Sequence, residues 1–324
     1  MAQAPNIDGL LITWGDRLFY PGNRIVKVKP QPKLNGDSAR QRAAAIRERI
    51  ESTVVRRAPQ VMVKVTGGGR GMKAIAAHFR YISKNGRLDI EDERGETLRG
   101  KDTLHELADD WRFGGTLIDD IAEPGQRREA FNIMLSMPRG TDLLTVQRAA
   151  REFAQIELTY HKYVMVLHDH QANPHVHISV RAESKHGKRL NPRKADLHRW
   201  RETFAEKLRG HGVEAEATRQ ATRGRTRNYE SLWRIKARED GRLRTSRAAT
   251  KSSPQARSTR TEAVEAWMQV GRALAVSGDQ ADRDLARSIA TFIREMPSIT
   301  PAAVPSRAPE LKPVSKPIDI DPRR

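Results

Sequence analysis

The 324-residue sequence contains no cysteine, and it has no run of about 18 apolar residues. Without cysteine the chain forms no disulfide bond and offers no thiolate to a metal, so its ten histidines become the natural metal ligands. Without a long apolar run we expect no stable membrane insertion. The first residues, Met1–Asp8, also lack the basic and apolar regions of a secretory signal, so we expect a cytoplasmic protein.

Apolar residues are also scarce, whereas basic residues are in excess. Only 37% of the residues are hydrophobic, so a good part of the chain is expected to lie outside a packed core. The net charge is +19, and residues 181–260 hold 23 Lys and Arg against nine Asp and Glu. Such an excess indicates a polyanion as partner. The arginines are mixed with Gly, Thr and Ser, not set opposite a bulky apolar face, which favours nucleic acid over an anionic membrane.

Strand-like and helix-like patterns alternate along the middle of the chain. Strands are predicted at 61–66, 131–137 and on both sides of a turn after residue 168, and helices at 72–82, 104–111, 141–158 and 195–210. Thr141 or Asp142 is placed to cap the third of these helices, with Phe153 and Ile156 among its inward residues. The turn after 168 is too short for a parallel crossover. The sequence therefore predicts an α+β fold, a mainly antiparallel sheet flanked by helices.

Composition divides the chain into four predicted regions. These are an N-terminal appendage (1–58), a compact domain (59–225), a basic and partly helical region (226–297) and a Pro-rich disordered tail (298–324). The appendage could be an extra domain element, a partner-binding arm or a poorly ordered tail. Within the third region, 229–239 could be a short helix, and 261–296 regains helical periodicity.

Three histidines gather in the predicted hairpin Val164–Arg181. His175 and His177 are two residues apart, so on a strand their side chains leave the same face. His168 ends the preceding apolar run and can fold back beside them. Three neutral imidazoles that converge suit a divalent metal ion. The alternative is a surface strand that carries histidines by chance.

A metal site beside a basic surface suggests phosphate chemistry, in which the metal polarises a phosphate oxygen. Such chemistry needs a nucleophile, and a tyrosine can form a covalent intermediate. Tyr81, one of five tyrosines, lies one position off the apolar stripe of helix 72–82, beside Arg80, Lys84 and Arg87. On spacing alone, a tyrosine that packs at a helix edge explains this position more simply.

Three motifs in order resemble those of the relaxases, or mobilisation nucleases, of conjugative plasmids. Gly67–Arg70 with Phe79–Gly86 is similar to the family's first motif, Ser136–Asp142 to the second and His168–His177 to the third. The resemblance covers about residues 60–225 and extends to the relaxase that processes T-DNA borders. These proteins belong to the histidine-hydrophobe-histidine (HUH) endonucleases.

The resemblance implies a mechanism and a set of site residues. Tyr81 would be the nucleophile that nicks one DNA strand at a plasmid transfer origin, leaving a 5′-phosphotyrosine and a free 3′-hydroxyl. His168, His175 and His177 would hold a divalent ion, Mg²⁺ or Mn²⁺. The family often has an acidic residue where this chain has His170. Asp169 or His170 is therefore a candidate for proton transfer, or for a hydrogen bond to one of the metal-binding histidines. Candidate DNA-binding residues are Arg80, Lys84, Ser136, Thr141, Lys188, Arg189, Arg193 and Lys194.

The resemblance also implies partners. These are single-stranded DNA at the transfer origin, accessory relaxosome proteins, a coupling ATPase and a type IV secretion system. The protein would act in the cytoplasm of a bacterial donor cell and could be carried to the recipient with the DNA.

Other functions fit parts of the pattern. A rolling-circle replication initiator shares the site chemistry but normally has its tyrosine after the metal motif, where only Tyr229 stands. A non-catalytic DNA-binding accessory protein would bind DNA without nicking it. In a structural zinc module, removal of the metal would unfold the domain.

Overall fold

The computed structural model describes residues 6–20, 36–121, 127–169, 173–226, 237, 240–242 and 253–299. The helices are α1 (Ile7–Phe19), α2 (Gly36–Val54), α3 (Met72–Ile82), α4 (Lys101–Phe113), α5 (Leu143–Glu157), α6 (Lys194–Gly210), α8 (Pro254–Ala275) and α9 (Gln280–Arg294). The strands are β1 (Met62–Gly67), β2 (Ile90–Asp92), β3 (Thr97–Leu98), β4 (Ala130–Ser136), β5 (His161–His168) and β6 (His175–Ser184).

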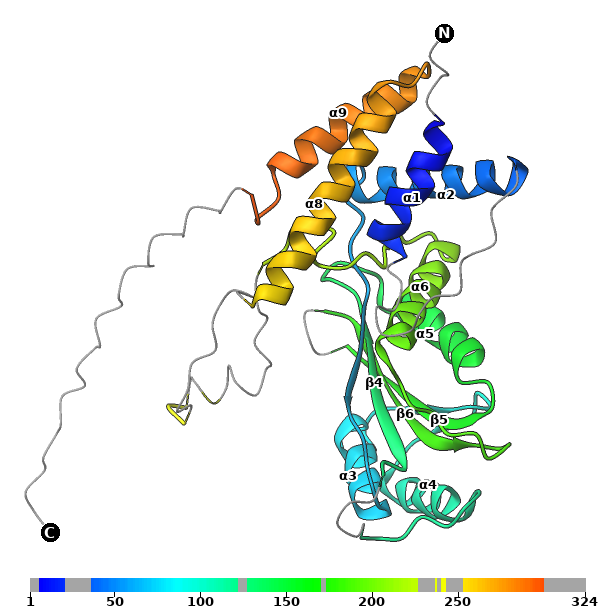
Figure 1. Cartoon of the computed structure of the whole chain (residues 1–324). Helices are drawn as coiled ribbons and strands as arrows, with labels where there is room; N and C mark the ends of the chain where they lie inside the picture. Colours follow the sequence, from blue (N-terminus) through cyan, green and yellow to red (C-terminus); the bar gives the residue numbers. More distant parts are fainter. Residues whose placement is uncertain are drawn as a thin grey trace, which may run out of the picture.

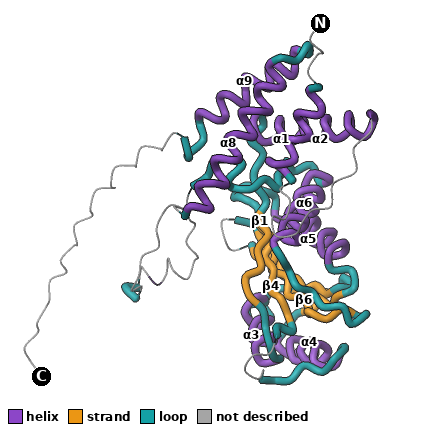
Figure 2. The backbone as a smooth tube through the Cα atoms, in the orientation of Figure 1, coloured by secondary structure: helices purple, strands orange, loops and turns teal. Residues whose placement is uncertain are grey.

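The six strands form one sheet in the order β1-β4-β6-β5-β2-β3, and every described pairing within it is antiparallel. β5 and β6 form the predicted hairpin at its centre, flanked by β4 and β2. Four consecutive residues of β5 are buried, and successive residues point to opposite faces of the sheet. Tyr163 and Met165 therefore join the core on one face, whereas Val164 and Val166 join the core on the other. Helices cover the sheet, and the predicted α+β class is confirmed (Figure 2).

Helices cover both faces of the sheet, and each face has its own apolar core. On one face α5 and α6 pack through Phe153, Trp200 and Phe204 against strand residues such as Ile178. On the other face α3 and α4 pack through Phe79 and Trp111 against Val164 and Val166. The amphipathic pattern of helix 72–82 therefore buries its apolar stripe against the centre of the sheet and fixes α3 there.

The two ends of the chain form a further helical module of α1, α2, α8 and α9. These helices share a third core, which includes Leu11 and Ile50 from the N-terminal pair and Trp267 and Phe292 from the C-terminal pair. Figure 1 shows the first pair and the last pair side by side, beyond one end of the sheet. Gly15 lies at the α1–α2 crossing, where an added Cβ would come within 2.5 Å of Ile46. Residues 6–20 and 36–58 are thus packed elements of the fold.

Several details of the sequence prediction differ from the structure. β2 and β3 were not predicted, and the helix predicted at 104–111 spans Lys101–Phe113. Ile156, expected to point inward, is 52% exposed, because it lies beside the buried stripe of α5, which ends with Phe153 and Ala154. The possible helix at 229–239 and the tail beyond 299 lie almost wholly outside the described residues. The four region boundaries stay a prediction. No helix in the described ranges combines the length and apolarity needed to cross a membrane.

Candidate active site

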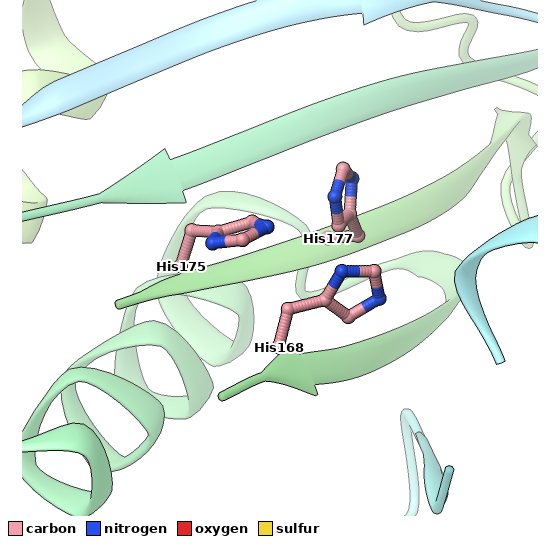
Figure 3. A group of neighbouring side chains, drawn as sticks. All are labelled: His168, His175 and His177. Atoms are coloured by element: carbon pink, nitrogen blue, oxygen red, sulfur yellow. The ribbon is translucent and has the colours of Figure 1, made fainter. Parts of the chain in front are cut away.

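Three imidazoles meet at the hairpin end of β5 and β6 (Figure 3). His168 pairs directly with His175, and His177 follows two residues later, so all three side chains leave the same sheet face. Their candidate ligand nitrogens lie within 4.8 Å of one another. His168 and His175 are buried, each 4% exposed, and His177 is half-buried. The convergence predicted from the spacing is therefore present in the fold.

Backbone carbonyls orient two of the rings. Nε2 of His168 lies 2.6 Å from the carbonyl oxygen of Ile82, and Nδ1 of His175 lies 2.9 Å from that of Asn173. A ring nitrogen facing a carbonyl oxygen carries the proton and donates it, which leaves a lone pair on the other nitrogen of the ring. Both rings thus present an unprotonated nitrogen, the form that a divalent metal ion requires. The donor set fits a metal ion, although its assignment as ligands stays a prediction.

Tyr81 comes to this cluster from the last turn of α3. Its ring lies edge-on to the ring of His177, with 6.5 Å between the ring centroids, and its side chain is 69% exposed. Ile82 follows Tyr81 in the chain, and its carbonyl accepts the hydrogen bond from His168, which ties this end of α3 to the histidine cluster. Spacing alone favoured a tyrosine that packs at a helix edge. In the structure, the Tyr81 side chain is instead exposed to solvent and lies beside the histidine cluster.

His78 is a fourth imidazole at this place, and the sequence analysis missed it. Its ring centroid lies 6.1 Å from that of Tyr81 and 6.5 Å from that of His177. Burial lowers the pKa of His78 to about 4, so the ring is neutral at neutral pH. Its Nε2 has no hydrogen-bond partner among the described residues. The signal was available, because His78 and Tyr81 are three apart on a helix and share one face.

The second motif supports the hairpin. Ser136 is the last residue of β4, pairs with His175, and donates its hydroxyl to the carbonyl of Pro174 (3.1 Å). It is 4% exposed. Thr141 donates to the carbonyl of Pro138 (3.0 Å), and Asp142 caps α5 by accepting from Thr145 N (2.7 Å). Both predicted DNA-binding hydroxyls are therefore engaged within the protein, and their role toward DNA stays a prediction.

The two candidates for proton transfer follow His168. Asp169 is exposed at the end of β5, next to the histidine cluster in the chain. His170 lies outside the described residues. Their participation stays a prediction.

Four of the predicted DNA-binding residues lie far from the cluster: Lys188, Arg189, Arg193 and Lys194. They follow Ser184, the end of β6 opposite to His175, and ten residues of strand span about 30 Å at ~3.3 Å per residue. Arg189 is also engaged, since it donates to Glu129 at 3.0 Å. The structure thus does not bring these four to Tyr81.

Arg80 and Lys84, in contrast, flank Tyr81. Arg80 is exposed and lines a groove of about 410 Å³ between α3 and α4. We name it the α3–α4 groove; its lining residues are Ala76, Arg80, Asn85, Arg87, Lys101, Leu104, His105 and Ala108. It has an apolar floor and three cations, two of which, Arg87 and Lys101, the sequence analysis had not assigned to DNA. Lys84 lies in the turn after α3, with a φ of +52°.

Comparison with known families identifies one domain in the chain. Residues 81–213 match the family described as "Relaxase: MobA/VirD2-like, nuclease domain". The match begins at Tyr81 and includes β2 to β6, α4 to α6 and all three clustered histidines. No curated protein matches the chain. The domain that carries the histidine cluster thus matches the MobA/VirD2-like relaxase nucleases, and this match supports the relaxase family predicted from the sequence.

Proposed function

We propose that this protein nicks single-stranded DNA at a transfer origin with Tyr81 as nucleophile and can rejoin the strand. The observation that carries the proposal is the meeting of Tyr81 with the histidine cluster. The two come from different elements, α3 and the β5–β6 hairpin, yet their rings lie 6.5 Å apart. A solvent-exposed phenol beside a cluster of imidazoles, two of which each keep one unprotonated ring nitrogen, is an arrangement suited to attack on a phosphate.

The reaction conserves the number of phosphoester bonds. The Tyr81 oxygen bonds to phosphorus, the bond from phosphorus to the 3′ oxygen breaks, and the phenolic proton leaves as the 3′ oxygen gains one. The products are a 5′-phosphotyrosine and a free 3′-hydroxyl. Because no high-energy bond is lost, the same site can run the step backwards and reseal the strand.

His168, His175 and His177 would hold the divalent ion, Mg²⁺ or Mn²⁺. When bound, such an ion polarises a phosphate oxygen and stabilises the charge that develops on it. The protein's part is to orient the rings of His168 and His175 through their carbonyl contacts and to keep these two rings away from bulk water. Asp169, which follows His168 directly, or His170 would exchange a proton with the reacting groups.

The α3–α4 groove would hold the DNA beside the scissile phosphate. Arg80, Arg87 and Lys101 supply positive charge for the backbone, and the apolar floor offers a surface for a base. No carboxylate lines this groove among the described residues. The groove therefore complements a nucleotide in both charge and polarity.

The finer biological role rests on the family alone. Relaxases of this type would act in the cytoplasm of a donor cell, with accessory relaxosome proteins, a coupling ATPase and a type IV secretion system. These partners are proposals for this chain.

A denaturing gel tests the activity. The protein is incubated with labelled single-stranded origin DNA and Mn²⁺, and a band of protein covalently joined to DNA should appear. Tyr81→Phe should abolish the band, whereas Tyr229→Phe, the matched control, should keep it. A rolling-circle initiator would give the reverse pattern. A DNA-binding accessory protein would shift the DNA on a native gel but form no covalent band with any variant.

A further inference from the structure

The helical module carries a groove of its own, between α8 and α9. It encloses about 470 Å³, and its described lining residues all belong to these two helices. The helices form a hairpin with a short connection, and other sides of them pack against α1 and α2 in the shared core (Figure 1). We name this surface the α8–α9 groove. It lies outside residues 81–213, the part of the chain that matches the nuclease family.

The floor of the groove is apolar and follows the spacing of helices. Its small residues are Gly271 and Ala275 on α8 and Ala286 and Ala290 on α9, and the members of each pair are four apart, so they share one helix face. Met268 adds an apolar side chain that is 42% exposed. A third helix can pack into such a groove with its own apolar residues at intervals of three and four.

Three arginines line the rim of the groove: Arg272 from α8, and Arg283 and Arg287 from α9. Arg272 is exposed and forms no ion pair with a described residue. Arg283 donates to the side chain of Gln280 and to the carbonyl of Ser277, which are both uncharged. Only Arg287 has a carboxylate partner, three residues earlier on α9. Among the described residues no carboxylate lines the groove, so a positive rim surrounds an apolar floor.

The chemistry of the groove distinguishes between possible occupants. A single DNA strand stacks its bases on exposed aromatic rings, but Trp267, the one aromatic residue of the described lining, is 0% exposed. A lipid surface takes up bulky apolar side chains, and Met268 is the only large one of this lining that is exposed. A second copy that met the same face would oppose Arg272 and its neighbours with identical cations. An amphipathic helix with acidic residues beside its apolar stripe complements both floor and rim.

We propose that the α8–α9 groove binds an acidic amphipathic helix of a partner protein. The apolar stripe of that helix lies on the floor of the groove, and its Asp or Glu side chains pair with Arg272, Arg283 and Arg287. The inference goes beyond the proposed function and does not depend on nicking. It gives the helical module, which lies outside the matched family domain, the task of recruiting a protein.

Two synthetic peptides test the proposal. Both are helical, about 18 residues or five turns long, labelled with fluorescein, and carry Leu at alternating intervals of three and four. The Glu peptide has Glu at the positions beside this stripe, and the Lys peptide has Lys there. The full chain should bind the Glu peptide at least ~10-fold more tightly than the Lys peptide, because like charges at the rim oppose binding. Fluorescence anisotropy at physiological ionic strength measures both.

Variants locate the binding, because a chain of net charge +19 attracts acidic peptides everywhere. Ala290→Trp fills the groove from an exposed position and should weaken binding of the Glu peptide by ~10-fold or more. Ala281→Trp, exposed on the first turn of α9 and not part of the lining, is the matched control and should bind normally. Arg272→Glu reverses one rim charge and should reduce the preference for the Glu peptide. Thermal unfolding verifies that each variant is folded.

Two results with the peptides would overturn the inference. One is equal binding of the Glu and Lys peptides by the full chain. The other is equal binding of the Glu peptide by the full chain, Ala290→Trp and Ala281→Trp.

A different occupant would overturn it as well. If oligo(dT) displaces the Glu peptide and binds Ala290→Trp more weakly than Ala281→Trp, the groove is a DNA site. If the chain sediments as a dimer that Ala290→Trp dissociates, the groove is a contact between copies. If the Glu peptide binds only after residues 300–324 are deleted, the occupant is the C-terminal segment of the chain itself.

Discussion

At the scale of single residues, the candidate site depends on which nitrogen of each histidine carries a proton. We expect His175→Ala to abolish the covalent band and the stabilisation of the folded protein by Mn²⁺, because it removes one of the three converging imidazoles. Mn²⁺ at 100 times its Kd should stabilise the parental protein by ~2.7 kcal/mol, and this gain should vanish in the variant. Thermal unfolding with Mn²⁺ and after EDTA measures both. His186→Ala, an exposed histidine beyond β6, is the control.

The same experiment distinguishes a catalytic ion from a structural one. The two cores on the sheet are apolar and complete without an ion, so the EDTA-treated protein should stay folded. If EDTA instead unfolds the domain in step with the loss of DNA binding, the structural zinc alternative is correct.

His78 permits a prediction about position. Its ring packs against both Tyr81 and His177, so we expect the Tyr81 side chain to lose its fixed position in His78→Ala. The rate of covalent band formation at saturating DNA should fall about 10- to 100-fold, the usual cost of a misplaced group, while the Kd for DNA stays unchanged. Lys73→Ala, an exposed change on the first turn of α3, serves as control. A loss in Kd at an unchanged rate would assign His78 to DNA binding instead.

His198 permits a prediction about pH. Burial, with Arg201 and Arg49 nearby, lowers its pKa in the folded protein to about 4, whereas an unfolded histidine titrates near 6.5. Between these values the unfolded chain takes up a proton that the folded one refuses, so stability falls as the pH drops from 6.5 to 4. His198→Gln removes this contribution. The Tm of the variant, measured against the parental Tm, should therefore rise from pH 7.5 to pH 5. A constant difference would contradict the lowered pKa.

At the scale of elements, the second motif has a structural task. Asp142 caps α5 through Thr145 N, and removing an N-cap side chain costs ~1 kcal/mol. Asp142→Ala should thus lower the free energy of unfolding in urea by about that amount, yet leave DNA affinity per folded molecule unchanged. Thr145→Ala keeps the capped backbone N–H and serves as the comparison. A drop in affinity without a drop in stability would place Asp142 at the DNA.

Local patterns predicted the elements that carry the site. Two apolar runs around a short turn were enough to predict the β5–β6 hairpin, and the strand period of two was enough to predict that its three histidines converge. A single apolar stripe was enough for α3. β2 and β3 were not predicted, because strands of three and two residues are too short to show a periodic pattern. Tyr81 could be placed at the cluster only by resemblance, because its proximity arises from the packing of α3 on the sheet.

At the scale of the whole molecule, the unpredicted feature is the joining of the two chain ends. α1 and α2 are at least 200 residues from α8 and α9, and a local sequence pattern cannot predict a contact over that separation. Their shared core could only emerge from the fold. It also holds α8 and α9 together, and the groove between them lies outside the matched family domain.

The junction between the two modules depends on a buried ion network around Arg49. Arg49 on α2 lies 2.9 Å from Glu216 and 3.0 Å from Glu202, and its side chain is 10% exposed against 3% for Glu216. It also lies over the rings of Phe19 and Tyr20. Burying these charges is unfavourable in itself. Removing one partner from the folded network is strongly destabilising, because the other charge then stays buried without a partner.

Arg49→Ala should therefore destabilise the chain far more than a surface change does. It leaves Glu216 buried and unpaired, which costs ~3–5 kcal/mol. Arg40→Ala, on the same helix but 73% exposed and paired with an exposed Asp37, should cost under ~1 kcal/mol. Urea unfolding measures both.

Replacing both charged residues together, as in Arg49→Met with Glu216→Leu, should recover most of the lost stability, because the cost comes from the unpaired buried charge of Glu216 and not from the lost attraction. If Arg49→Ala costs no more than Arg40→Ala, the buried ion network does not hold the junction, and other contacts, such as the hydrogen bond from Thr222 to the carbonyl of Leu18, hold it instead.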